Sequence, residues 1–410
     1  MSNDSRRTGI NSHDLIIGPS GAGKTRGYVL PNIYQAESSL IVTDTKGDLY
    51  DQTLQSLLAR GYRVQRVNFR DCKESPTGYN PFDYIRMTHG NPNEQDVLSI
   101  AAAFCPIEDW QQPFWEYAAR GLIASMIYFV MAYLPKHEAS PGSLTKLFDT
   151  VVDGRYERLL DDIRDEEPDS FAIRQYKFVE ACKDAEKMKG SIYGIVGEKL
   201  GIFDYDGMRH LLSQRERVNF ANLRREKTAL IVDVSDCDRS QDRLIALFYQ
   251  QAFKTLIDGG ASGLPVRVIL DDFAAGCRMG DFDNLISVLR SRNIHVSVIV
   301  QSIAQLEALY RGRASIIADN FDTTLYLGGN DPVTAKYIAE RANMLPHAVL
   351  SMDLDDALLL QRGRPPRKVK RFKLEDHPEI ADHVSREDGE EKSFVDILDS
   401  FELGDDGIPF

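Results

Sequence analysis

One eight-residue motif constrains the fold of this chain more than any other feature of its sequence. Residues 18–25 read Gly-Pro-Ser-Gly-Ala-Gly-Lys-Thr and fit the pattern G-x-x-x-x-G-K-[ST] at every position. The apolar residues 14–18 predict a buried strand before the motif, and a helical pattern follows it. A glycine-rich turn between a strand and a helix is typical of the phosphate-binding loop, or P-loop, of nucleotide-binding α/β proteins. A chance glycine-rich turn is the alternative, and the flanking segments argue against it.

Each residue type in the loop has a physical task. Glycines allow backbone N–H groups to approach phosphates closely. Lys24 would neutralise the β- and γ-phosphates, and the hydroxyl of Thr25 would bind Mg²⁺. We therefore expect ATP and Mg²⁺ as cofactors, bound by Gly18, Pro19, Ser20, Gly21, Ala22, Gly23, Lys24 and Thr25.

A second apolar strand, at residues 266–270, ends in two carboxylates, Asp271 and Asp272. This is the Walker B pattern, in which the first acid holds Mg²⁺ and the second orients or deprotonates the attacking water. Glutamate is usual at the second position, and Asp272 is one methylene shorter, so its reach toward that water is open. Two acids that cap the next helix are the alternative. Beside a complete P-loop we favour the Walker B reading.

Three further polar residues lie near predicted strand ends. Arg290 precedes the strand at 295–300, and Gln301 follows it. An arginine before a strand can reach a γ-phosphate held by a neighbouring subunit, and an amide at the strand's carboxyl end can sense that phosphate. A surface arginine is the more common alternative. Lys46, after the strand at 40–43, is equally open to a nucleotide or DNA contact and to a solvated turn.

The order of predicted elements indicates the fold class. Apolar segments that read as buried strands alternate with helical patterns; they lie at 14–18, 40–43, 64–68, 229–234, 266–270, 295–300 and 324–327. This alternation predicts a mostly parallel sheet with helices on both faces. Residues 93–220 lack comparable strands and predict several helices. We expect an α/β nucleotide-binding domain in two parts, 1–92 and 221–384, around an inserted all-α domain at 93–220.

Charge is unevenly distributed along the chain. The formal net charge of -13 argues against a surface that coats nucleic acid as a whole. Residues 385–406 contain nine acidic and two basic residues, which predicts a flexible acidic tail over 385–410. Residues 362–373 hold seven basic residues, for which we favour an edge strand with outward charges over a phosphate contact.

The sequence also indicates in which cellular compartment the chain folds. The longest uncharged apolar run, residues 122–134, is shorter than the about 20 residues of a membrane span and predicts a buried helix. Five cysteines without metal-ligand spacing fit a reducing cytosol. We expect the chain to be soluble as given.

Together these segments resemble the TraG/TraD-type coupling proteins of type IV secretion and conjugation. The matching segments keep their order from about residue 13 to residue 378 and include LIIGPSGAGKTRGYVLPNI, IVTDTKGDLYDQT, VRVILDDFA and LISVLRSRNIHVSVIVQSIAQLEALY. The resemblance implies a RecA-like P-loop NTPase fold with an inserted all-α domain. It implies an ATP hydrolase that works as a homo-hexamer and passes a relaxase–DNA complex or an effector protein to a secretion channel.

The resemblance also implies roles for single residues. Lys24, Asp272, Arg290 and Gln301 match catalytic positions, with Arg290 as the inter-subunit arginine finger and Gln301 as the sensor. Thr25 and Asp271 match the Mg²⁺ ligands. The family usually carries Glu where Asp272 stands, which leaves the hydrolysis rate open.

A second departure concerns the membrane. The family usually has an N-terminal anchor, whereas only seventeen residues precede Gly18. Either the anchor was removed, or the protein is cytoplasmic and lies at the inner membrane's cytoplasmic face through channel or adaptor proteins. The apolar stripe of the acidic tail is our candidate docking element, with packing on its own ring as the alternative; it consists of Phe394, Val395, Ile397, Leu398 and Phe401.

The expected DNA contact is not sequence-specific, because it would use phosphates. Basic residues of the insert, Lys183, Lys187 and Lys189, are the expected sources. Two alternatives to the coupling function remain: a nucleotide-gated substrate adaptor with little turnover, and a soluble DNA-translocating ATPase outside secretion.

Overall fold

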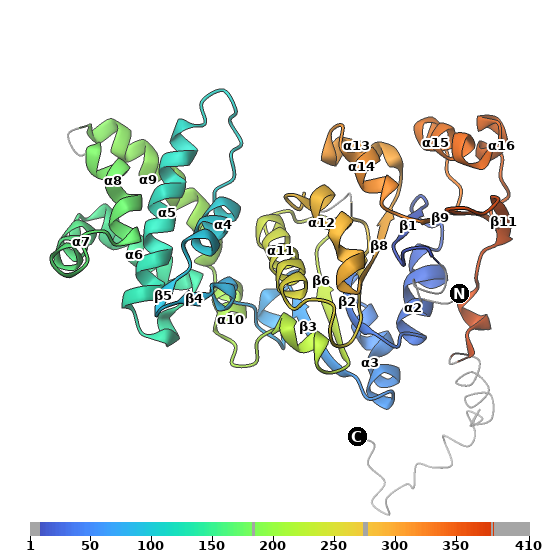
Figure 1. The fold of residues 1–410 in the computed structure, drawn as a ribbon, viewed down its shortest axis with the longest axis horizontal. Helices are drawn as coiled ribbons and strands as arrows, with labels where there is room; N and C mark the ends of the chain where they lie inside the picture. Colours follow the sequence, from blue (N-terminus) through green and yellow to red (C-terminus); the bar gives the residue numbers. More distant parts are fainter. Residues whose placement is uncertain (1–8, 183–184, 274–277, 379, 381–410) are drawn as a thin grey trace, which may run out of the picture.

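The computed structural model describes residues 9–182, 185–273, 278–378 and 380. A nine-stranded sheet in the order β11-β10-β9-β1-β8-β7-β2-β6-β3 forms the centre of one lobe (Figure 1). Its strands are β1 (Asp14–Ile17), β2 (Ser39–Asp44), β3 (Arg63–Asn68), β6 (Thr228–Asp233), β7 (Val266–Leu270), β8 (Ile294–Val300), β9 (Thr323–Tyr326), β10 (Asp356–Gln361) and β11 (Arg367–Lys370). All seven strands expected from the sequence are present. Every residue of β2, β6 and β7 is buried, which explains why these strands read as continuous apolar runs.

The sheet is parallel except at one side. β1 pairs in parallel with both β8 and β9, and β7 pairs in parallel with β8 and β2. Only β10 and β11 run antiparallel to their neighbours. Because the parallel strands point the same way, the residues that follow β1, β7 and β8 emerge at one edge of the sheet.

Helices cover both faces of the sheet. Ile16, Leu40 and Ile231 point to one face, where they pack with the P-loop helix, η1 (Thr25–Val29) followed by α2 (Leu30–Tyr34), and with α3 (Leu49–Ala59). The alternate residues of the same strands enter a second core on the opposite face. This second core continues into the helical lobe. In the sheet lobe, the helices whose buried residues join it are α11 (Asp242–Asp258), α12 (Phe282–Leu289), α13 (Ile303–Tyr310), α14 (Ala314–Asp319), α15 (Pro332–Ala342) and α16 (Pro346–Leu350).

A helical lobe lies beside the β3 side of the sheet (Figure 1). A short hairpin, β4 (Met87–Thr88) and β5 (Asn91–Pro92), leads into it. Its helices are α4 (Glu94–Phe104), α5 (Phe114–Tyr133), α6 (Pro141–Val152), α7 (Arg155–Glu166), α8 (Phe171–Ala181), α9 (Glu186–Leu200) and α10 (Asp206–Ser213). Across the described part of 94–227 the structure has no strand, apart from a single bridge between Gly78 and Arg217. We propose that these helices are the inserted domain and keep 93–220 as its proposed bounds.

The apolar run at 122–134 lies mostly in α5, the central helix of this lobe. Residues 122–130 of α5 are all buried, and the helix packs against α4, α6, α8 and α9. Surrounding neighbours explain why the run is apolar on every side. Within the described ranges, no helix is both long enough and apolar enough to cross a membrane.

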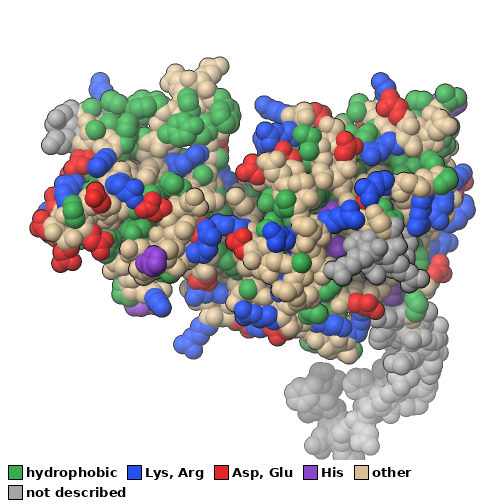
Figure 2. Space-filling view, viewed as in Figure 1, with side chains coloured by type: hydrophobic (Ala, Val, Ile, Leu, Met, Phe, Trp, Pro, Cys, Tyr) green, Lys and Arg blue, Asp and Glu red, His purple; other side chains and the backbone are tan. Residues whose placement is uncertain are grey.

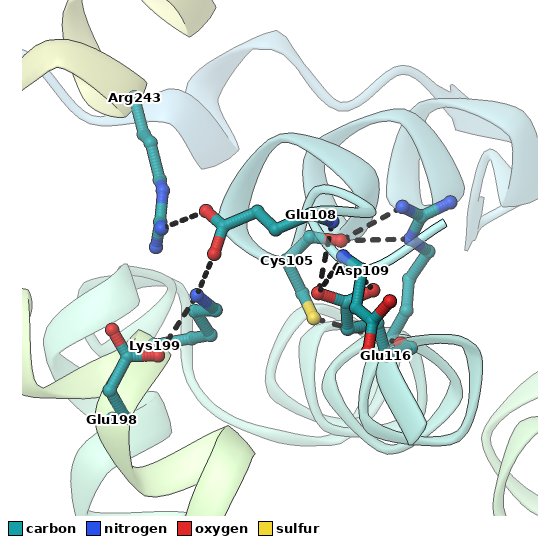
Figure 3. Close-up of polar contacts among 8 residues, drawn as sticks. Cys105, Glu108, Asp109, Glu116, Glu198, Lys199 and Arg243 are labelled. Carbon is teal, nitrogen blue, oxygen red and sulfur yellow. Dashed lines mark hydrogen bonds and ion pairs between the residues drawn. The ribbon is translucent and has the colours of Figure 1, made fainter. Parts of the chain in front are cut away.

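An ion-pair bridge joins the helical lobe to the sheet lobe (Figure 3). Glu108, in the loop between α4 and α5, contacts Arg243 in the first turn of α11 and lies 3.2 Å from the ammonium group of Lys199 at the end of α9. Glu116 fixes this loop, because its carboxylate accepts a hydrogen bond of 2.9 Å from the Glu108 backbone N–H. The guanidinium of Arg120 donates to the loop's first carbonyl oxygen. The loop therefore links α9 to α11 through one carboxylate.

The basic stretch at 362–373 forms the edge of the sheet, which confirms the edge-strand prediction. β11 pairs with β10, and Lys368 and Lys370 both reach the carboxylate of Asp356, at 2.6 and 2.7 Å. Figure 2 shows Lys and Arg side chains gathered on this side of the sheet lobe. The acidic tail predicted at 385–410, with its apolar stripe, lies outside the described residues.

Candidate nucleotide site

The P-loop follows β1 as a tight turn whose shape requires glycine. Gly21 and Gly23 have φ angles of +77° and +78°, in the left-handed region that other residues adopt at a cost. Gly18 approaches the chain closely, because a Cβ there would lie 3.0 Å from that of Leu327. The loop ends in the first turn of η1, where no side chain caps the backbone N–H groups. Unpaired N–H groups at a helix N-terminus favour a phosphate.

Lys24 folds back over the loop. Its ammonium group donates hydrogen bonds to the backbone oxygens of Gly18, at 3.0 Å, and Pro19, at 3.2 Å. It also lies 3.9 Å from a carboxylate oxygen of Asp272. The loop carbonyls and Asp272 therefore hold the Lys24 ammonium group at the place where phosphates would meet the loop.

Thr25 and Asp271 face each other across the end of the sheet. The Thr25 hydroxyl donates to Asp271 Oδ2 at 3.5 Å. Burial and the neighbouring charge of Asp272 raise the pKa of Asp271 to about 6, although Lys24 acts in the opposite direction. A hydroxyl and a buried carboxylate are hard oxygen ligands of the kind Mg²⁺ prefers, and the raised pKa shows a carboxylate whose charge is only partly compensated. The residues present therefore fit a divalent cation.

The described residues contain no cluster of three or more His, Cys, Asp or Glu that could hold a metal. A cation at Thr25 and Asp271 would need phosphate oxygens and water to complete its ligands, as Mg²⁺ commonly does beside a nucleotide.

The backbone of Asp272 lies in the left-handed region. Its φ angle is +48°, a conformation uncommon for residues other than glycine. This turn places its carboxylate between Lys24 and Gln301, whose side-chain amide donates to Asp272 Oδ1 at 3.4 Å. Asp271 and Asp272 also line a cavity of about 60 Å³, which exceeds the space that one water needs. The arrangement can position a water next to two carboxylates.

The structure thus brings five predicted site residues together and leaves Arg290 apart. Lys24, Thr25, Asp271, Asp272 and Gln301 meet at one edge of the sheet. Arg290 is exposed and precedes the opposite end of β8, which spans seven residues and about 20 Å. Lys46 is exposed in the turn after β2. Arg290 cannot reach the P-loop of its own chain.

No pattern in the sequence indicates the contact that Arg371 makes with the P-loop. Its guanidinium donates to the carbonyl oxygen of Ala22 at 3.2 Å and also to the carbonyl of Leu327 after β9. In the next turn of the chain, Glu375 pairs with Arg26 of η1. We call residues 371–375 the strap, because they cross the start of the P-loop helix. The only sequence signal was the basic stretch, which does not indicate a partner 349 residues away.

The lysines expected to meet DNA differ in their surroundings. Lys187 is exposed on α9. Lys189 lies 2.8 Å from Glu157 and above the ring of Tyr193, so its charge is already paired. Lys183 lies outside the described residues.

Comparisons with known proteins identify a matching family and several similar proteins. The sequence model of the family "Type IV secretory system Conjugative DNA transfer" matches residues 3–342. Protein VirD4 of Rhizobium radiobacter is 22% identical over 400 residues, which cover 88% of this chain and 57% of that protein. The chain thus spans little more than half the length of this relative.

Solved structures share the fold. The plasmid coupling protein TrwB in complex with the ATP analogue ADPNP superposes with a TM-score of 0.66 at 17% identity, covering 90% of this chain and 86% of that one. TrwB in complex with ADP and Mg²⁺ gives a TM-score of 0.64 at 16% identity, with 89% and 87% covered. The predicted RecA-like P-loop NTPase fold is confirmed.

Proposed function

Because the chain belongs to the family of type IV secretory system conjugative DNA transfer proteins, we propose that it is an ATP-hydrolysing coupling protein. It would recruit a relaxase–DNA complex or a protein substrate and drive or gate its transfer into a type IV secretion channel. The observation that carries the proposal is the convergence of Lys24, Thr25, Asp271, Asp272 and Gln301 at one edge of the sheet. TrwB, which shares the fold, has been solved with an ATP analogue and with ADP and Mg²⁺.

We propose a task in hydrolysis for each residue. Lys24 would exchange its carbonyl contacts for the β- and γ-phosphates, which it can reach without leaving the loop. Thr25 and Asp271 would hold Mg²⁺, which when bound neutralises part of the phosphate charge. Asp272 would orient the attacking water, and the amide of Gln301 fixes the direction of its carboxylate.

Arg290 gives a reason to propose assembly. An arginine at the far end of β8 can act on a γ-phosphate only in a neighbouring subunit, because it lies about 20 Å from its own Gln301. A ring of identical subunits, proposed as a hexamer, would present each Arg290 to the next P-loop.

The remaining partners are proposed from charge and family. DNA would bind through its phosphates without sequence preference, with exposed Lys187 as one contact. We propose that channel or adaptor proteins hold the chain at the cytoplasmic face of the inner membrane and that the acidic tail at 385–410 is the docking element.

A mixing experiment tests the proposal. Lys24→Ala chains and Arg290→Ala chains should each be inactive as assemblies in a steady-state ATPase assay. Mixed rings should regain activity, because a Lys24→Ala subunit still supplies its arginine to the intact P-loop of a neighbour. Full activity of Arg290→Ala alone would contradict the inter-subunit role.

The nucleotide-gated adaptor remains a second candidate. The observation that favours it is the contact of Lys24 with the shorter acid, Asp272. If ATP binds tightly but wild-type rings hydrolyse it no faster with DNA than without, the adaptor is the better account.

A further inference from the structure

One side of α11 faces the two acids of the candidate site. The cavity of about 60 Å³ that Asp271 and Asp272 line, here called the acid cavity, is also lined by four residues of this helix: Asp242, Ile245, Ala246 and Tyr249. Their spacing of i, i+3, i+4 and i+7 places them on one side of the helix. Tyr249 is fixed there, because its hydroxyl shares a hydrogen bond with the hydroxyl of Thr43 in β2. The first two turns of α11 therefore form one wall of the space next to the acids.

The start of the same helix also contacts the helical lobe. Gln241, the residue before α11, is buried, and its side-chain amide donates a hydrogen bond to the hydroxyl of Tyr205 at the start of α10. Arg243 pairs with Glu108 of the α4–α5 loop (Figure 3). Direct polar contacts thus connect the helical lobe to the helix that forms the wall of the acid cavity.

The α4–α5 loop is held as one unit. The carboxylate of Glu116 accepts hydrogen bonds from the backbone N–H groups of Glu108, at 2.9 Å, and Asp109, at 3.3 Å. The carboxylate of Asp109 accepts two further backbone N–H groups of the loop, at 2.9 and 3.2 Å. At the tip of the loop, Trp110 has 79% of its surface exposed. A contact at this exposed ring would therefore be transmitted to Glu108.

We propose that Glu108 is a positioning residue for ATP hydrolysis. Through Arg243 it would hold the start of α11 in place and so fix the wall of the acid cavity, where Asp272 orients the attacking water. This inference rests on the proposed hydrolysis of ATP. Because Glu108 acts through α11 and not on the nucleotide, its loss should slow turnover and leave the affinity for ATP unchanged.

The test measures steady-state ATPase kinetics of the full chain with Mg²⁺ and DNA, together with ATP affinity by titration calorimetry. Glu108→Gln should lower kcat about fivefold and leave the ATP affinity unchanged. Lys199 keeps Glu198 as a partner at 3.0 Å, so this variant buries no unpaired charge. Arg243→Gln removes the same contact from the other side and should lower kcat by a similar factor. The double variant should be no slower than either single one, because both residues act through one contact.

Lys254→Gln is the matched control. Lys254 also joins α11 to the helical lobe, through Asp96 of α4, but it lies about three turns beyond Arg243 and lines a different cavity. We expect it to change neither kcat nor ATP affinity.

Each other outcome has a distinct meaning. An equal fall of kcat in Lys254→Gln would overturn the proposal, because any loosening of the joint between the lobes would then slow turnover. Unchanged kcat in Glu108→Gln, or a loss of ATP affinity as large as the loss of kcat, would overturn it as well, and the proposed function would survive. A wild type that does not hydrolyse ATP would overturn both.

Discussion

From the buried carboxylate of Asp271 we predict an effect on stability as well as on function. In the chain without nucleotide, burial and Asp272 raise its pKa from 3.8 to about 6. A raised pKa means that folding favours the protonated carboxyl, so ionisation of Asp271 lowers the free energy of unfolding. This penalty grows as the pH rises from about 4 to about 6 and is constant at higher pH. The raised pKa corresponds to a penalty of about 3 kcal/mol in the free energy of unfolding at pH 8, and to about half of that at pH 5.

Asp271→Asn should therefore stabilise the protein in the absence of Mg²⁺ and nucleotide. We expect its melting temperature at pH 8 to exceed that of the wild type by about 5 °C or more, with a smaller difference at pH 5. Mg²⁺ with ATP should raise the melting temperature of the wild type more than that of the variant, because the variant lacks one metal ligand. Asp319→Asn, a substitution at an exposed carboxylate, is the control and should show neither effect. A variant that melts lower than the wild type at pH 8, or a difference independent of pH, would contradict a destabilising buried charge at Asp271.

Three further predictions concern assembly, the joint between the lobes, and DNA. Arg290→Ala should lower the ATPase rate of assembled rings by about 10³-fold or more and leave ATP affinity unchanged, measured by phosphate release and titration calorimetry; fast turnover by a demonstrable monomer would contradict the finger. Glu108→Gln should weaken the bridge between Lys199 and Arg243 and speed hydrogen exchange in the α4–α5 loop and the first turn of α11; unchanged exchange would show that apolar packing alone holds the joint. Lys187→Ala should reduce the slope of log affinity against log salt by about 1 for DNA of any sequence. The same substitution at Lys189, which is paired with Glu157, should reduce it less. A loss of affinity confined to one DNA sequence would contradict phosphate contact.

The sequence predicted the parts of the fold that leave a local pattern. Strands buried on both faces read as apolar runs, as β6 and β7 show, and the P-loop and the two acids follow such runs. The alternating charges at 368–373 predicted the edge strand that the structure places at 367–370, because one side of an edge faces solvent.

Contacts between distant segments left no local pattern. Arg371 contacts Ala22 because the chain returns through the antiparallel strands β10 and β11, and no spacing of residues in the sequence indicates this return. Glu108 likewise joins α9 to α11 across more than 90 residues of chain, and in the sequence it is one acid among many. The left-handed backbone of Asp272 was also hidden, since aspartate has no strong preference for it. The folded chain was needed for all three.

We propose above all that this P-loop hydrolyses ATP in an assembly that responds to DNA. The most direct measurement is steady-state phosphate release by the assembled wild-type chain with Mg²⁺, with and without DNA, beside Lys24→Ala. We predict slow release without DNA, faster release with DNA of any sequence, and none from Lys24→Ala in either condition. Release by Lys24→Ala equal to that of the wild type, or no ATP-dependent release from wild-type assemblies with DNA, would contradict the account.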